Sequence, residues 1–541
     1  MELCHQHPTM RPPRDSTPKQ VRGPSSRSKL ACEQCRKSHV KCDQARPCAL
    51  CKRRGTECSL RQEVLFTARE FKAPAAGLLG DFVSETIEGP ATFVDQTQEV
   101  SNLYQVARAN EETSGVSSYQ HPSPWPIFSR QASPITDSTD AFFLSRYVDF
   151  IGPRFDMFDG VLRYFSTVVP QLALSDKLVL LSCVAVAARQ YTLVNGHQQH
   201  NDEQALTYYS VAIHLLSERL QNSRPEPVVF ASCLLIAHCE MVESKATDWD
   251  LHLKGTGDLV KLHGWHGMSG GLAQASFWIY CRMIILASLC AGKPTALEPK
   301  EWIPGGVFPD PATWTLESWQ KKVVFLLGVV QNFWSCTRDI EYNDEHVVQL
   351  HVARWKQLEA DLIRHQSRAP AVASPLSILP PNGEDNPFQG VRYLNGTVSA
   401  AWQMLHTAFL ILTICKPCSR ASRLSLLSSP DITQRAQTYT RQIVGNTLTN
   451  RCSIAWTNAV QLLTIAGQCL VAEPERNACI RALQEIQDQT GWDTRASVNR
   501  LNAAWVNSWR HESSRTHSAV PHVDAGKLLY HVWLGDEGSL T

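Results

Sequence analysis

Six cysteines stand close together near the N-terminus, and their types and spacing could hold metal ions. They are Cys32, Cys35, Cys42, Cys48, Cys51 and Cys58. They form two half-motifs of the pattern Cys-x2-Cys-x6-Cys, joined by a five-residue loop. The thiolates of a Cys-x2-Cys pair can converge on one tetrahedral zinc ion, and a third cysteine six residues later returns to that ion after a short helix. The repeat therefore predicts a zinc-binding unit.

The number of ligands predicts how many ions this unit holds. Each half offers three thiolates, whereas tetrahedral zinc takes four ligands, so two zinc ions are satisfied only if two of the sulfurs bridge both ions. We therefore expect two Zn²⁺ per chain. A single four-cysteine site that includes Cys35 and Cys48 is the alternative, but it leaves the repeat unused and exposes reactive thiols beside basic residues. A disulfide framework fits poorly, because residues 1–15 carry no apolar segment typical of a secretory signal.

Three short segments of the cysteine cluster resemble a known family. Residues 31–43 (ACEQCRKSHVKCD), 46–51 (RPCALC) and 55–58 (GTEC) are similar to the zinc binuclear cluster (Zn₂Cys₆) domain of fungal transcription factors. In that family the first and fourth cysteines bridge the metal ions, which implies Cys32 and Cys48 here. The resemblance implies a nuclear protein that binds double-stranded DNA, regulates RNA polymerase II genes and contacts the transcription machinery or co-regulators.

Basic residues are concentrated around the cysteines. The whole chain carries 52 Lys and Arg against 51 Asp and Glu, whereas residues 11–61 carry fourteen against four. Cations of this kind neutralise DNA phosphates, which supplies much of the affinity of DNA-binding proteins. The candidate DNA-contacting residues are Arg36, Lys37, Ser38, His39, Lys41, Arg53 and Arg54. Of these, Lys41, Arg53 and Arg54 are the candidates for phosphate contacts.

Ser38 and His39 depart from the family pattern, which usually has basic residues there. A lysine or arginine donates to guanine O6 and N7 in the major groove, whereas a mostly neutral histidine offers one N–H. Backbone carbonyls at the end of the first short helix can still accept from cytosine N4. We therefore expect a short G·C-rich element of the CGG type, with altered side-chain readout.

Composition divides the chain into four segments. We expect a disordered basic arm (1–27), a Zn₂Cys₆ DNA-binding domain (28–62), a largely disordered linker (63–138) and an all-helical regulatory domain (139–541). Leu60, Val64 and Phe71 could share a helix face, but Pro74 ends it before a coiled coil can form. A second copy of the chain is therefore still a candidate partner, although the sequence predicts no coiled coil for dimerisation.

The expected fold class is a small Zn₂Cys₆ domain, made of two short helix-loop halves, plus a large all-α regulatory domain. Helical spacing of apolar residues predicts helices over 140–150, 176–194, 204–221, 226–243, 248–263, 271–291, 315–340, 344–365 and 390–416, with several more to about 511. Asp176 is the expected N-cap of a central buried helix. The longest apolar stretches, such as 178–188 and 228–237, are shorter than the roughly 18 residues that a membrane helix needs, and no membrane association is expected.

The helical region carries a second, more diffuse resemblance. It rests on residues 146–147 (RY), 155–159 (FDMFD), 169–174 (VPQLAL), 183–189 (CVAVAAR), 249–255 (WDLHLKG) and 271–282 (GLAQASFWIYCR). These segments are similar to the regulatory region of the same fungal factors. The resemblance implies binding of partners or effectors and supplies no catalytic residues, so the chain is expected not to be an enzyme.

Three features invite other interpretations. A carboxylate cluster could hold two metal ions (Asp339, Glu341, Asp344, Glu345 and His346), Cys415 and Cys418 could form a redox pair, and five aromatic or imidazole side chains could line an effector pocket (Trp249, His252, His263, Trp265 and His266). We favour a charged loop as the explanation of the carboxylate cluster and chance placement as that of the two cysteines. The aromatic and imidazole side chains are best explained by core packing. The competing function is an interaction or effector-binding protein with a mainly structural zinc cluster, and a small-molecule effector remains open.

Overall fold

The fold is taken from a computed structural model. It describes residues 35, 43, 47–56, 134–196, 199–222, 226–242, 246–338, 345–383, 386–418 and 422–510. Contacts divide the chain into two compact units, residues 1–64 and 65–541, and each is treated by itself. In the described part of the first unit, the regular element is helix α2 (Ala49–Arg54).

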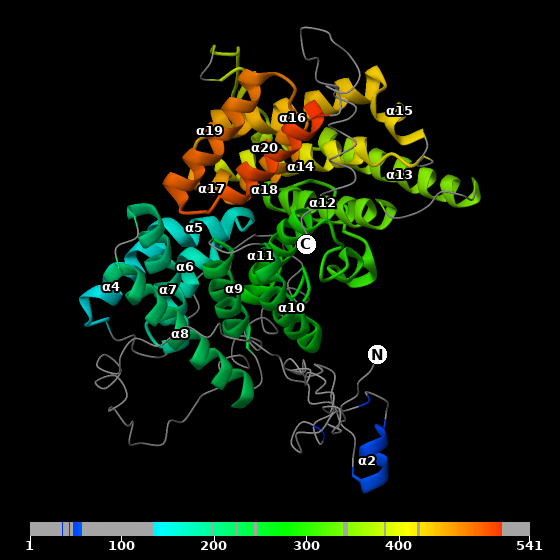
Figure 1. The fold of residues 1–541 in the computed structure, drawn as a ribbon. Coiled ribbons are helices and arrows are strands. Elements are labelled where there is room, and N and C mark those ends of the chain that lie inside the picture. Colours follow the sequence, from blue (N-terminus) through cyan, green and yellow to red (C-terminus); the bar gives the residue numbers. More distant parts are fainter. Residues whose placement is uncertain are drawn as a thin grey trace, which may run out of the picture. The chain divides into compact units, whose positions relative to one another are not determined.

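The second unit is a helical assembly (Figure 1). Its N-terminal half contains α4 (Ser138–Arg146), the π-helix η1 (Tyr147–Ile151), α5 (Gly152–Phe155), the 3₁₀ helix η2 (Asp156–Phe158), α6 (Tyr164–Ala173), α7 (Lys177–Asn195), α8 (Gln199–Asn222), α9 (Pro227–Met241), α10 (Ala246–His263) and α11 (Gly271–Ala291).

The C-terminal half continues with shorter connecting elements and further helices. It contains η3 (Pro299–Glu301), η4 (Pro304–Gly306), α12 (Leu316–Arg338), α13 (Glu345–Ser367), η5 (Ala371–Ala373), β1 (Ser377–Leu379), β2 (Gly390–Arg392), α14 (Gly396–Ile414), α15 (Arg423–Leu427), α16 (Pro430–Thr449), α17 (Ser453–Trp456), α18 (Ala459–Gln468), α19 (Glu473–Thr490) and α20 (Arg495–Arg510).

Helix α7 is the centre of the N-terminal half, as its sequence predicts. The Asp176 carboxylate caps it by accepting hydrogen bonds from the backbone N–H of Leu178 (2.9 Å) and Val179 (3.4 Å). Apolar residues occur almost all round α7, so the helix needs neighbours on every side. It packs against α4, α6, α8 and α9, and Figure 1 shows α8 and α9 alongside it.

Helix α14 plays the corresponding role in the C-terminal half. Its N-cap is Asn395, whose side-chain oxygen accepts hydrogen bonds from the N–H groups of Thr397 and Val398. Every residue from Val398 to Ile414 is buried. The helix contacts α12, α13, α16, α17 and α18, so the core of this half is built around it.

Three helices test the expectation that no apolar stretch is long enough to span a membrane. By length and composition alone, α7, α11 and α14 are long and apolar enough to cross a bilayer, so the expectation that no stretch is long enough is wrong. Their apolar windows are 67%, 94% and 94% buried inside the protein. Neighbouring helices therefore cover most of this apolar surface.

Among the described residues of the helical unit, a β-hairpin departs from the expectation of helices alone. Strands β1 and β2 pair antiparallel, with Ser377 opposite Arg392 and Leu379 opposite Gly390. The helix expected over 390–416 consequently begins at Gly396, because its first residues belong to β2. Gly390 fits this position because a Cβ there would lie 2.8 Å from the Thr449 hydroxyl oxygen.

Buried histidines make the stability of this unit depend on pH. His365 and His406 are 3% and 5% exposed, and burial lowers the pKa of each from 6.5 to about 4. Between these values the unfolded chain binds a proton that the folded chain does not. The free energy of unfolding should therefore fall as the pH falls from 6.5 to 4, by about 1.4 kcal/mol per pH unit for each histidine.

Replacing His406 with glutamine should remove one histidine's share of this dependence. Urea unfolding measured between pH 4.5 and 6 should give a slope smaller by about 1.4 kcal/mol per pH unit in His406→Gln than in the native chain. His214→Gln, a change of an exposed histidine, serves as the control. Equal slopes in His406→Gln and the native chain would contradict the assignment.

Candidate metal centre and nucleic-acid interface

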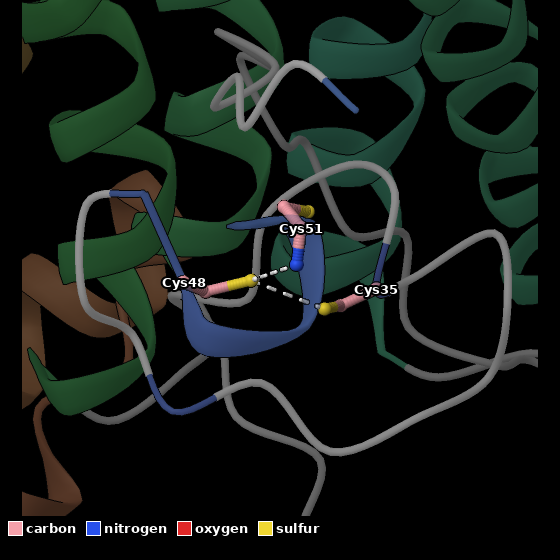
Figure 2. Close-up of side chains that lie close together, drawn as sticks. All are labelled: Cys35, Cys48 and Cys51. Atoms are coloured by element: carbon pink, nitrogen blue, oxygen red, sulfur yellow. Dashed lines mark hydrogen bonds between the residues drawn. The ribbon is translucent and has the colours of Figure 1, made fainter. Parts of the chain in front are cut away.

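Three cysteine sulfurs converge in the N-terminal unit. Cys35, Cys48 and Cys51 are all buried, and their sulfurs lie within 4.8 Å of one another. The Sγ atoms of Cys35 and Cys48 are 3.6 Å apart (Figure 2). Cys35 belongs to the first half-motif and the other two cysteines to the second, so the fold brings the two halves of the repeat together.

The start of helix α2 positions Cys48. This residue is the N-cap of the helix, and its sulfur accepts a hydrogen bond from the Cys51 backbone N–H at 3.4 Å (Figure 2). The Asp43 carboxylate accepts another from the backbone N–H of Ala49 at 2.9 Å. Exposed N–H groups and the positive end of the helix dipole stabilise negative charge, which suits both a carboxylate and a thiolate.

A left-handed glycine ends the same helix. Gly55 has φ 65°, and its backbone N–H donates to the Cys51 carbonyl oxygen, which also accepts from the Thr56 N–H at 3.2 Å. Glycine adopts this conformation without steric cost and is the usual residue at a helix C-terminus. The helix between Cys48 and Gly55 is therefore fixed at both ends, with Cys51 held on its inner side.

The sulfur geometry fits zinc. Two sulfurs bound to one tetrahedral zinc ion at about 2.3 Å lie roughly 3.8 Å apart. The observed 3.6 Å between Cys35 and Cys48 is close to that separation. Buried thiols gain little stability from lying this close together when no ion stands between them. Thiolates that share a cation are stabilised by that cation. Cys35, Cys48 and Cys51 can therefore hold a metal ion together.

The outer side of α2 carries the positive charge expected of a DNA-binding surface. Lys52, Arg53 and Arg54 occupy the last turn and are all exposed, while Cys51 points inward. Basic side chains near a helix C-terminus are favoured by the dipole. One short helix thus combines a metal-facing sulfur with a cationic outer face.

The remaining predicted site residues lie outside the part that the structure describes. They are the metal-ligand candidates Cys32, Cys42 and Cys58 and the DNA-contact candidates Arg36, Lys37, Ser38, His39 and Lys41. Sequence reasoning did not single out Asp43 or Gly55. The preference of glycine for helix C-termini could have indicated Gly55, whereas Asp43 lies five residues before the N-cap Cys48 and outside the reach of a local capping rule.

The aromatic and imidazole residues considered for an effector pocket belong largely to the core. Trp265 stacks on Phe230 with ring centroids 5.0 Å apart, and His263 packs against Trp265 at 4.9 Å. His252 is 3% exposed, with Nε2 3.0 Å from a Glu240 carboxylate oxygen. These contacts are those of core packing, while the side chain of Trp249 is outside the described part.

The two enzymatic alternatives find little support in the described residues. Cys415 ends α14, and its Sγ lies 3.8 Å from the Leu412 carbonyl oxygen, so the Cys415–Cys418 segment follows a core helix without a βαβ context. Most of the carboxylate cluster, from Asp339 to Asp344, lies outside the described residues, and His346 is exposed at the start of α13.

Comparisons with known protein families agree with these two units. Residues 30–65 match the model of the fungal Zn(2)-Cys(6) binuclear cluster domain, and a domain of that kind binds two zinc ions. Residues 142–519 match the model of the fungal specific transcription factor domain. Both are transcription factor domains. No curated protein and no solved structure matches the chain.

Proposed function

Because the chain belongs to the family of fungal specific transcription factors, whose domain covers most of its length, we propose that it acts in the nucleus on RNA polymerase II genes. It is a zinc-binding, DNA-binding transcriptional regulator. We further propose that its binuclear cluster reads a short G·C-rich element. The convergence of Cys35 and Cys48, one from each half-motif, is the observation that carries the proposal of a binuclear cluster.

The proposed zinc ligands are Cys32, Cys35, Cys42, Cys48, Cys51 and Cys58. With two ions and six sulfurs, two sulfurs must bridge both ions. Cys48 suits this role, because its sulfur lies near that of Cys35 in the first half and belongs to the same helix start as Cys51 in the second. Bound zinc would supply rigidity to this small unit, since the buried cluster among its described residues consists of Cys35, Cys48 and Cys51 with Leu50 packed against them.

The proposed DNA contacts divide into two classes. Arg53 and Arg54, with Lys41 of the first half, would neutralise phosphates and fix the position of the cluster on the duplex. We propose that Arg36, Lys37, Ser38 and His39 would face the base edges. Since a neutral histidine donates one N–H, we expect weaker discrimination at the position that it faces.

The proposed organisation assigns 28–62 to DNA binding and 139–541 to regulation, with the arm 1–27 and the linker 63–138 outside both. The helical unit would contact co-regulators or the transcription machinery, and a second copy of the chain is a further candidate partner. We propose no catalytic activity, because the two matched domains are transcription factor domains and the weighed catalytic clusters have simpler explanations.

Replacing Arg53 with glutamine should weaken DNA binding without changing which sequence is preferred. In a plot of log K against log salt concentration, loss of one phosphate contact makes the negative slope shallower by about 0.9. The same loss reduces the affinity roughly eightfold at 0.1 M salt. Fluorescence anisotropy with one labelled duplex at several salt concentrations measures both. Arg495→Gln removes an exposed arginine of the helical unit and should leave both unchanged. An unchanged slope in Arg53→Gln would exclude Arg53 as a phosphate contact.

The experiment that tests the proposed function compares two duplexes of equal length, one with a CGG-type element and one with the same bases in scrambled order. At physiological salt, the full chain should bind the duplex with the CGG-type element at least about a thousandfold more tightly than the scrambled duplex. Equal affinities with a strong salt dependence would mean nonspecific binding. Absence of binding to either would favour the interaction protein with a structural cluster.

A further inference from the structure

Two buried arginines face one cavity in the helical unit. Arg154 of α5 and Arg282 of α11 are 4% and 5% exposed, and both line the cavity together with His238 of α9. Asn458, just before α18, and Trp492, just after α19, close it from the C-terminal half. The cavity therefore lies where the two halves meet, consistent with the contacts of α5 with α17 and of α11 with α18.

The charge of Arg154 has no counterpart among the described residues. Arg154 makes no ion pair with them, and its buried Nε has no hydrogen-bond partner. Burial lowers the pKa of the guanidinium to about 10, so it still carries its proton at neutral pH. A buried cation without a partner is strongly destabilising, so such groups are normally paired.

Arg282 is held in place by hydrogen bonds to neutral groups, and the Asp156 carboxylate acts on its charge only through space. It donates from Nη2 to the Phe155 carbonyl oxygen at 2.7 Å and from Nη1 to the Met157 sulfur at 3.4 Å. These acceptors are neutral. They fix the direction of the guanidinium without offsetting its charge, and Asn458 Nδ2 donates to the same Met157 sulfur at 3.2 Å.

The acidic group that acts on Arg282 is Asp156, and its hydrogen bonds go elsewhere. The Asp156 carboxylate accepts hydrogen bonds from the backbone N–H of Phe165 at 2.8 Å and of Ser166 at 2.7 Å, at the start of α6. Burial raises its pKa to about 7, so its negative charge is only partly present at neutral pH. It therefore compensates the charge of Arg282 only in part.

The other walls of the cavity are neutral and largely apolar. His238 packs edge-on against Phe155 (5.1 Å) and Trp492 (5.8 Å), and burial with the two nearby arginines lowers its pKa to about 3, which keeps it neutral. Apolar side chains, including Met241, Ile279 and Met283, line much of the rest. The space is small, so it has room for a compact ion and not for a large metabolite.

We propose that the helical unit binds a small oxyanion, a carboxylate or a phosphate, between Arg154 and Arg282. Guanidinium groups match such oxygens with paired, charge-assisted hydrogen bonds. The anion would supply the missing counter-charge and join α5, α9 and α11 to the α17–α19 segment. This site is independent of zinc and DNA, so it stands whether or not the proposed function is correct.

Thermal unfolding of the full chain tests the site with acetate and with inorganic phosphate as probes. At pH 7.5 and constant ionic strength, replacing chloride with the probe that binds should raise the Tm by roughly 3 °C at about a hundredfold excess over the dissociation constant. The comparison between probes tells a carboxylate site from a phosphate site. No saturable rise with either probe would overturn the proposal.

Two variants and a control make the test specific. Arg154→Gln should lose most of the increase in Tm that the probe causes. Its Tm in chloride should not fall, because an unpaired buried charge has been removed. Asn458→Asp places a carboxylate in the cavity, so it should raise the Tm in chloride and reduce the response to the probe. Arg364→Gln, a change of an exposed arginine, should respond like the native chain. A native response in both Arg154→Gln and Asn458→Asp would place the anion elsewhere and overturn the proposal.

Discussion

Cys48→Ser is expected to empty the metal centre of both zinc ions and to lower DNA affinity by more than roughly a hundredfold, because metal binding and folding are coupled in small zinc domains. The sulfur of Cys48 lies 3.6 Å from that of Cys35 and caps α2. Loss of a proposed bridging sulfur takes a ligand from each ion at once. Zinc per chain, measured by inductively coupled plasma mass spectrometry, and anisotropy with a labelled duplex provide the two readouts.

A second cysteine supplies the control for this variant. Cys336 is exposed in the helical unit, so Cys336→Ser makes the same chemical change away from the cluster. It should leave zinc content and DNA affinity unchanged. If Cys48→Ser retained two zinc ions, Cys48 would not be a bridging ligand, and the binuclear arrangement would need another pair of sulfurs.

Trp302→Ala should destabilise the helical unit by about 3–5 kcal/mol, the range for removing a buried tryptophan from a packed core. Trp302 is fully buried, and its indole N–H donates to the Leu297 carbonyl oxygen at 3.0 Å. Its ring fills the space beside Gly328, where a Cβ would come within 2.6 Å of it. The midpoint of urea unfolding, followed by far-ultraviolet circular dichroism, should fall accordingly.

The same variant tests whether the two units of the chain are stable independently of each other. Because contacts divide residues 1–64 from 65–541, Trp302→Ala should keep two zinc ions per chain while its helical unit loses stability. Val307→Ala changes a nearby side chain that is 75% exposed, and it should alter the free energy of unfolding by less than about 0.5 kcal/mol. A loss of stability equal to that of Val307→Ala would mean that Trp302 is not a core residue.

The sequence was most informative where a local rule acts alone. The Cys-x2-Cys-x6-Cys repeat predicted the cluster because tetrahedral zinc restricts ligand spacing. Asp176 was predicted as an N-cap, and its carboxylate does accept hydrogen bonds from the first turn of α7. Long helices such as α11 (Gly271–Ala291) were predicted from apolar spacing, with bounds that agree with the structure.

The sequence was less informative where distant segments meet. The hairpin of β1 and β2 is only three residues long on each side, too short for alternation to distinguish it from the helix that follows. Arg154 and Arg282 are far apart in the chain, and each looks like an ordinary helix residue. Only the packing of α5 against the core brings them to one cavity, which no periodicity could predict.

Selection of bound duplexes from a random library by the full chain, with and without zinc, tests whether the zinc-loaded chain reads a DNA sequence. We predict enrichment of a short G·C-rich motif by the zinc-loaded chain, and loss of that enrichment when zinc is removed by a chelator. Binding without any enriched motif, or the same motif with and without zinc, would mean that the chain does not read DNA through a zinc cluster.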